Sequence, residues 1–389
     1  MKRYMVLLLC FVFLLAGCGP KEQTAATLPE SIPDTFPATL PEAGADAEPE
    51  TTTPAELAES ELFAVSVPAV TERYTLEDGT ELFSYTAQHM QLIHPDEDIA
   101  DRVILNFLNR VDATREDAES TLQAAQMDYQ SKAQWHPYFY QVIYSPTRID
   151  YDVLSLFGTQ NCYNGGIHGS LSCISANYDL TNGEVLTLGS IMHQDATKED
   201  FISIIIHKLA ENEDDYELFS NYEDGVRSRL GGDENLYEDF FFTQTGLSFF
   251  FSPYEIAPYA SGVITVEIPY NELTGLIYDG YFPAERESIQ GTMRTGSFME
   301  TDMEQFSSMA EVTLSSGQEV LVAYPEGTVQ DIRITIPGDG MNLPEYTVFA
   351  AYEMSDRNAV VISLAPEDAE GITVSYTTGT ETQAIPLAE

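Results

Sequence analysis

The chain has 389 residues, of which 63 are acidic and only 17 are lysine or arginine, so its formal net charge at pH 7 is −46. A charge of this sign and size disfavours nucleic acid and anionic lipid headgroups as partners and favours cations or basic proteins. The alternative is an acidic surface that serves solubility alone.

The amino terminus has the pattern of a bacterial lipoprotein signal. Two basic residues precede an apolar run, residues 5–16, which is shorter than the roughly 20 residues that cross a bilayer and has the length of a signal-peptide core. The run ends in LAGC at 15–18, which resembles the lipobox, whose cysteine is diacylated and begins the mature chain. We therefore expect removal of residues 1–17 and lipidation of Cys18, which places the protein on the extracytoplasmic face of the cell membrane.

A stalk and one disulfide are expected next. Residues 18–60 are rich in proline and acidic side chains and contain a single aromatic residue, Phe36, a composition that predicts a disordered stalk. Of the four cysteines, only Cys162 and Cys173 lie in the folded part of the mature chain. Two cysteines in an extracytoplasmic protein can pair, so we expect a disulfide between them.

Folded sequence begins near Leu62. Two strand-like segments meet at Glu77-Asp78-Gly79, which is a hairpin turn signal. Apolar residues then recur every fourth position over 99–111 and again over 118–129. This pattern predicts either two helices joined by a turn or one long helix with a polar face.

The middle of the chain alternates strand and helix signals. Strands are expected at 138–144 and 149–157, and Asn182-Gly183 suits a type I′ turn in the following meander. Thr197 and Asp200 resemble a capping box that opens a helix. A second helix over 216–230 and strands over 247–251 and 262–269 complete the unit.

These elements predict the domain organisation. Residues 61–160 and 161–285 should form the two parts of one α+β module, with helices packed on an antiparallel sheet. Residues 286–305 are predicted to be a linker. Six short segments of alternating hydrophobicity, separated by turn signals, then predict a small all-β, sandwich-like domain over 306–389.

Two signatures resemble those of a known family. The first contains GGIHG at 165–169 and NYDL at 177–180, and the second is FFSPYEIAPYASG at 250–262. Together they resemble the paired extracytoplasmic domains of unknown function found in the anti-sigma factor RsiV and in the non-catalytic part of the deacetylase PdaC, over roughly residues 62–285. The resemblance implies an α+β fold and, in the RsiV branch, binding of lysozyme as a protein ligand. We expect neither the transmembrane signalling segment of RsiV nor the catalytic domain of PdaC in this protein, because the sequence shows no pattern for either.

The sequence offers no pattern typical of an enzyme, a metal site or a cofactor site. The glycines around His168 lack the lysine of a phosphate-binding loop, and the six histidines do not have the spacing of zinc ligands. The nucleophile elbow Gly-x-Ser-x-Gly is also absent. We therefore expect a protein that is not an enzyme and that uses neither metal nor cofactor.

Candidate ligand contacts come from the two signatures. They are His168 and Tyr178 in the first and Tyr254 and Tyr259 in the second. The structural alternatives are a histidine held by the backbone of a tight turn and tyrosines that bury their rings and keep their hydroxyls wet. The acidic segment 211–239 would steer a basic ligand towards the protein or is simply a solvated surface.

The sequence as a whole predicts a lipid-anchored extracytoplasmic binding protein. Its ligand would be a basic protein such as lysozyme or a cell-wall component such as peptidoglycan. The alternatives are an accessory subunit of a cell-wall-active enzyme and a structural surface spacer.

Overall fold

The computed structural model describes most of the chain from residue 62 to residue 387. The residues that it leaves out within this range are 133, 213–215, 233–237, 285–288, 300–305, 315–318, 339–342, 357 and 364–368. The predicted signal peptide, the predicted lipidation site Cys18 and the predicted stalk lie outside the described residues. The chain divides into a unit Met1–Pro54 and a unit Ala55–Glu389. Within the described part, no helix combines the length and the apolar character needed to cross a membrane.

A five-stranded sheet forms the centre of the predicted α+β module. Its strands are β2 (Ala69–Thr75), β3 (Glu81–Gln88), β5 (Tyr138–Ile149), β6 (Val153–Tyr163) and β7 (Ser170–Asp179), in the order β2-β3-β5-β6-β7. Neighbouring strands are antiparallel except β3 and β5, which pair in parallel. The expected hairpin between β2 and β3 is present, and Gly79 adopts the positive φ that the turn requires.

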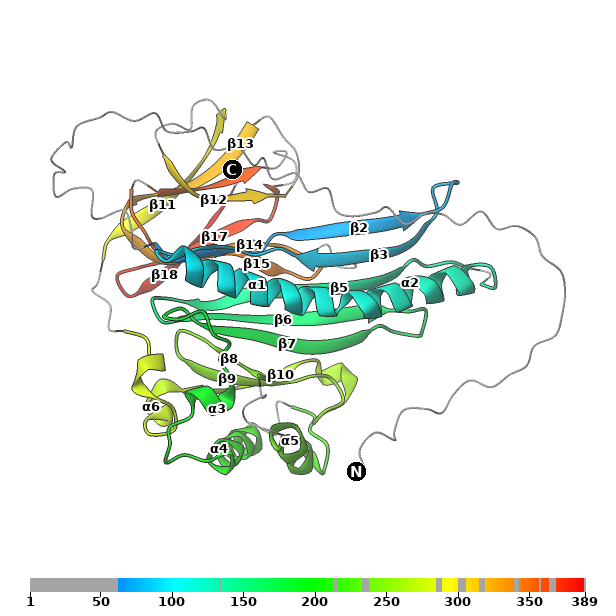
Figure 1. Ribbon diagram of the computed structural model, residues 1–389, viewed down its shortest axis with the longest axis horizontal. Helices are drawn as coiled ribbons and strands as arrows, with labels where there is room; N and C mark the ends of the chain where they lie inside the picture. The colour runs from blue at the N-terminus through cyan, green and yellow to red at the C-terminus, as the bar shows by residue number, and fades with distance from the viewer. Residues whose placement is uncertain are drawn as a thin grey trace. The chain divides into compact units, whose positions relative to one another are not determined.

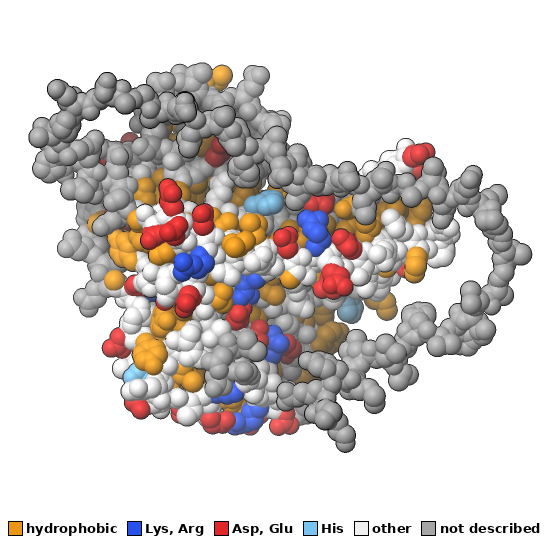
Figure 2. All heavy atoms as spheres, in the orientation of Figure 1, with side chains coloured by type: hydrophobic (Ala, Val, Ile, Leu, Met, Phe, Trp, Pro, Cys, Tyr) orange, Lys and Arg blue, Asp and Glu red, His pale blue; other side chains and the backbone are white. Residues whose placement is uncertain are grey.

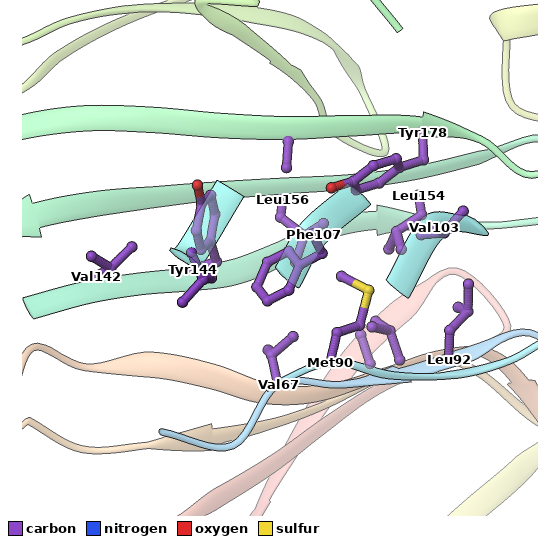
Figure 3. Packing of buried hydrophobic residues seen from close by; sticks show 14 of the residues in the cluster. Val67, Met90, Leu92, Val103, Phe107, Val142, Tyr144, Leu154, Leu156 and Tyr178 are labelled. Carbon is purple, nitrogen blue, oxygen red and sulfur yellow. The ribbon is translucent and has the colours of Figure 1, made fainter. Parts of the chain in front are cut away.

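Two helices cover one face of this sheet (Figure 1). They are α1 (Glu97–Ala113) and α2 (Arg115–Tyr129), so the two-helix alternative is the one observed. Asp96 caps α1 by accepting hydrogen bonds from two backbone N–H groups of its first turn. The buried stripe of α1 includes Val103 and Phe107, which pack on Tyr144 and other sheet residues in the core drawn in Figure 3.

A three-stranded sheet packs on the opposite face. Its strands are β8 (Phe240–Phe242), β9 (Gly246–Phe251) and β10 (Ile264–Pro269), in the order β10-β9-β8. The attached helices are α3 (Leu188–Ile191), α4 (Lys198–Glu211), α5 (Tyr222–Leu230) and α6 (Tyr270–Leu273), with 3-10 turns η2 (Tyr259–Ser261) and η3 (Asp279–Tyr281). Figure 1 shows α4 and α5 beyond this sheet as seen from β7. Polar contacts join the layers, since the Asn177 amide donates to the Phe240 carbonyl over 2.8 Å.

The predicted disulfide between Cys162 and Cys173 is wrong, because both thiols are free. In the β6–β7 pairing, Cys162 lies opposite Ser170 and Cys173 opposite Thr159. The two cysteines are thus offset by three positions, about 10 Å along the strands, whereas a disulfide needs Cα atoms within about 7 Å. An odd offset also sends the side chains to opposite faces. Cys162 packs towards α2, and Cys173 packs on the three-stranded sheet, where burial raises the pKa of its thiol to about 12.

The predicted C-terminal β-domain is a sandwich of two sheets. The first has the order β18-β17-β14-β15-β1-β4 and the second the order β11-β13-β16-β12. Their bounds are β1 (Ala64–Ser66), β4 (Gln91–Ile93), β11 (Gly291–Met299), β12 (Ser307–Thr313), β13 (Glu319–Gly327), β14 (Val329–Ile336), β15 (Tyr346–Met354), β16 (Asn358–Ser363), β17 (Thr373–Thr378) and β18 (Glu381–Pro386). Both sheets contribute to one core, for example Met293 and Leu321 from one and Ile332 and Val348 from the other.

The sandwich includes strands from the start of the folded sequence. Val65 of β1 lies opposite Ala350 of β15 on one side and Leu92 of β4 on the other. Strand β11 falls within 286–305, the range predicted as a linker. The sandwich and the helical module therefore share strands rather than lying end to end along the chain.

Candidate functional site

The two sequence signatures meet in space. The tip of the β6–β7 hairpin carries His168, whose ring stacks on that of Tyr259 with centroids 4.7 Å apart and planes 28° apart. Tyr259 in turn contacts Tyr254, with ring centroids 5.6 Å apart. We call these three side chains, His168, Tyr254 and Tyr259, the aromatic platform. It unites three of the four residues that the sequence singled out.

The hairpin tip is shaped by glycine. Gly165 has a φ of +87°, and a Cβ atom at this position would overlap the Tyr138 hydroxyl. The Lys132 ammonium contacts that same hydroxyl and the Gly165 carbonyl, 3.4 Å away, which fixes one side of the tip. At the other side, Nδ1 of His168 lies 2.8 Å from the Gly169 carbonyl. His168 is therefore held by the backbone of a tight turn, as the structural alternative expected. Its ring nevertheless remains exposed and stacks on Tyr259.

The second loop holds a residue in an unusual conformation. Tyr254 has a φ of +74°, in the left-handed region that non-glycine residues rarely adopt. The turn is closed locally, because the Tyr254 N–H donates to the Ala257 carbonyl over 3.0 Å and the Ser252 N–H donates to the Glu255 carboxylate over 2.7 Å. Strained residues of this kind cost on the order of 1–3 kcal/mol and cluster at binding sites.

The platform has an apolar, solvent-facing neighbourhood. The Tyr254 side chain is 59% exposed, and Ile167, next to His168 on the hairpin tip, is fully exposed. Ile167 has no signal in the sequence that marks it as a contact residue, because a single isoleucine between Gly166 and His168 belongs to no periodic pattern. Exposed apolar groups that lie together mark surfaces of interaction more often than single scattered ones do.

A pocket of about 670 Å³ adjoins the platform. It lies between the C-terminal end of α1, strand β7 and the turn of residues 252–255, so this turn borders both the pocket and the platform. The polar and charged side chains that line it are Arg110, Thr114, Asp117, Tyr144, Gln160, Ser172, Ser175, Arg229, Glu238, Asp239, Ser252 and Glu255.

Ion pairs cross the pocket. Arg110 of α1 pairs with Glu238, and Arg229 of α5 reaches both Asp239, over 2.8 Å, and Glu255, over 3.4 Å. Burial raises the pKa of Asp239, and the opposing charge of Arg229 offsets part of this shift. No motif in the sequence indicated these residues as a group, since they come from four separate segments.

Tyr178 does not join the platform. It is fully buried on the α1 face of the sheet, near Phe107 and Tyr144, and burial raises the pKa of its hydroxyl. Successive side chains of a strand point to opposite faces of the sheet. Asn177 of β7 faces the three-stranded sheet, so Tyr178, the next residue, faces the helices. Within the described part of the chain, no group of three or more histidine, cysteine or acidic side chains is placed to hold a metal ion.

Comparison with known proteins places a family domain over part of this site. Residues 190–271 match DUF3298, a protein family of unknown function. The chain carries a DUF3298 domain. This domain contains α4, α5, β8 to β10 and the loop with Tyr254 and Tyr259, whereas His168 lies before it in the sequence. The aromatic platform is therefore assembled from the DUF3298 domain and the hairpin that precedes it.

Solved structures of two DUF3298 family proteins are similar to this chain. One, from Bacteroides fragilis NCTC 9343, is 18% identical with a TM-score of 0.43 and is matched over 57% of this chain and 96% of its own. The other, from Pseudomonas aeruginosa PAO1, is 18% identical with a TM-score of 0.39 and is matched over 57% of this chain and 97% of its own. No curated protein sequence matches this chain at a significant level.

Proposed function

We propose that this chain is an extracytoplasmic binding protein, tethered to the cell membrane through lipid on Cys18, that captures a basic protein at the aromatic platform. The observation that carries the proposal is the stacking of His168 on Tyr259, which brings two distant segments to one exposed surface. The resemblance to RsiV makes lysozyme the first candidate ligand. An accessory role beside a cell-wall enzyme and a spacer role are the alternatives.

The platform has the chemistry of a protein-binding centre. Tyrosine supplies a large contact area at low entropic cost, and aromatic residues dominate the energetics of many interfaces. The left-handed Tyr254 is held by hydrogen bonds within its own turn, so its ring is pre-positioned before a ligand arrives. Such preorganisation lowers the cost of binding.

Charge favours a basic partner. The formal net charge of −46 creates a negative field around the protein, which accelerates the approach of a basic ligand and weakens as salt rises. On the face drawn in Figure 2, acidic side chains are spread over the described surface rather than gathered in one patch. The field therefore steers the ligand, and the aromatic platform supplies the specific contact.

Substitution of the platform tests this function. The purified protein is immobilised, and lysozyme or solubilised peptidoglycan is passed over it at low and moderate salt. We expect lysozyme to bind, more tightly at low salt, and His168→Ala or Tyr259→Ala to lose about 2 kcal/mol, roughly thirtyfold in affinity. Tyr278→Ala is the matched control, because Tyr278 is 43% exposed and packs on His193 instead.

Three outcomes would count against the proposal. Lysozyme could fail to bind at either salt concentration, the platform variants could bind it as the unmodified protein does, or peptidoglycan alone could bind. Thermal unfolding of each variant checks that lost binding is not lost folding.

A further inference from the structure

A buried tyrosine side chain in the pocket beside the platform has a hydroxyl that the fold leaves unused. Tyr144 of β5 lines this pocket and is only 4% exposed. Its backbone N–H and carbonyl both hydrogen-bond to the Gln88 side chain, at 2.6 and 3.0 Å. Its hydroxyl, by contrast, has no hydrogen-bond partner among the residues that the structure describes. This hydroxyl is therefore available to a group that enters the pocket, because the hydroxyl of a largely buried tyrosine normally has a hydrogen-bond partner.

A second unused hydroxyl lies nearby. Tyr178 is fully buried and does not line the pocket, and its hydroxyl makes no well-formed hydrogen bond within the described part of the chain, although the Arg110 guanidinium lies close enough to lower the pKa of this hydroxyl in part. Both tyrosines lie close enough to Arg110 and Glu238 for these charges to influence their titration. Burial raises the pKa of Tyr144 to about 12, so its hydroxyl is neutral at pH 7 and can accept a hydrogen bond.

The charges that line the pocket are unbalanced. Among the described residues, four carboxylates, those of Asp117, Glu238, Asp239 and Glu255, face two guanidinium groups, those of Arg110 and Arg229. Both guanidinium groups already pair with carboxylates. An anion would have to displace one of these carboxylates, whereas a cation would find excess negative charge in a partly desolvated site, where electrostatic attraction is stronger than in water.

We propose that this pocket binds a guanidinium or primary ammonium group, which donates hydrogen bonds to the Tyr144 hydroxyl and to the carboxylates of the pocket. A volume of about 670 Å³ is ample for an arginine or lysine side chain. The turn of residues 252–255 borders both sites, so a basic residue beside the ligand segment on the platform would enter the pocket. This last step rests on the proposed function, whereas the cation site itself does not.

Small probes test the cation site directly. Nα-acetyl-arginine amide is added to the full-length protein at low salt, and binding is measured by saturation-transfer NMR. The neutral isostere Nα-acetyl-citrulline amide is the matched probe. We expect the arginine probe to bind at least about tenfold more tightly, because a hydrogen bond to a charged donor is stronger than one to a neutral donor. Equal binding of the two probes, or binding of neither, would overturn the proposal.

Substitution of Tyr144 identifies the hydroxyl. Tyr144→Phe removes only an atom that no described residue hydrogen-bonds, so the unfolding midpoint should not fall. Affinity for the arginine probe should drop about tenfold. The control is Tyr376→Phe, a substitution of another buried tyrosine that lies in the C-terminal sandwich. Unchanged affinity in a stably folded Tyr144→Phe variant would contradict the assignment.

The two proposals fail separately. His168→Ala and Tyr259→Ala should leave binding of the arginine probe unchanged, because neither residue lines the pocket. Probe binding without any protein ligand supports the cation site and removes the function proposed for the platform. Capture of lysozyme at the platform, without probe binding and without an effect of Tyr144→Phe, supports the function proposed for the platform and removes the cation site.

Discussion

Replacing Arg148 by alanine should lower the free energy of unfolding by about 3–5 kcal/mol. Arg148 of β5 is fully buried, and its Nε donates to the Asp150 carboxylate over 2.6 Å. One terminal nitrogen donates to the Tyr270 hydroxyl, 2.7 Å away, and to the Tyr281 carbonyl, 2.6 Å away. Loss of the guanidinium leaves the Asp150 charge buried without its counter-ion. Removing one partner of a buried ion pair destabilises a protein more than replacing both partners by apolar side chains.

Arg148 also joins two parts of the fold. Tyr270 and Tyr281 belong to the segment that follows β10, whereas Arg148 and Asp150 belong to the five-stranded sheet. Its guanidinium lies over the rings of Phe242 and Tyr270, at 5.5 and 5.7 Å from their centroids. Arg148→Lys should destabilise the protein less than alanine but still measurably, because an ammonium group cannot satisfy all these partners at once.

Urea denaturation measures both effects. The control is Arg227→Ala, which breaks a pair with Glu199 of the same 2.6 Å length but at the surface, where water replaces the partner. We expect the control to unfold close to the unmodified protein. If Arg148→Ala cost no more than Arg227→Ala, the buried cluster would not contribute as argued.

Ending the chain after residue 299 should abolish cooperative unfolding of the helical module. The truncation removes β12 to β18, including β15, which pairs with β1. Ala350 and Tyr352 of β15 belong to the core beneath α1, together with Val65 of β1. Each large apolar side chain that loses its cover forfeits about 1.5–3 kcal/mol, so a few such losses are comparable with the roughly 5–15 kcal/mol that stabilises a typical domain.

Circular dichroism and thermal unfolding of the truncated protein provide the measurement. Deleting residues 20–54 is the control, since these residues belong to a unit separate from Ala55–Glu389. The control should keep the unfolding midpoint of the full chain. A truncated protein that melts cooperatively at that same midpoint would show that the sandwich is dispensable for the helical module.

Local features of this fold could be predicted from sequence because they depend on neighbouring residues. The capping box of Thr197 and Asp200 forms at α4. The type I′ turn expected at Asn182-Gly183 is wrong, because Gly183 has a positive φ but Asn182 does not, whereas that turn requires it at both residues. The fold class, α+β with a C-terminal β-sandwich, follows from patterns of the same kind. These signals require no knowledge of which strands become neighbours.

Pairing between distant strands was not predictable in the same way. Alternating apolar residues identify a strand but not its partner, so β1 was placed in the helical module although it pairs with β15. The error at Cys162 and Cys173 has the same origin, because only the β6–β7 register reveals their odd offset. Tyr178 lies near His168 in the sequence, but its position in β7 directs its side chain into the core beneath α1, away from the exposed His168.

The candidate site also has a part that the sequence predicts and a part that it does not. His168, Tyr254 and Tyr259 lie in recognisable signatures and could be selected without a structure. Their stacking could not, nor could the pocket next to them, whose lining depends on how α1, β7 and α5 converge. A site built from side chains of separate elements becomes visible only when the packing is known.

Hydrogen–deuterium exchange in the presence of lysozyme shows where the ligand binds. We expect slower exchange in peptides that cover residues 163–169 and 252–262, the two segments that build the aromatic platform. We expect no comparable change in the C-terminal sandwich. Protection confined to the sandwich or to α4, with the platform segments exchanging as they do in the free protein, would contradict binding at the platform.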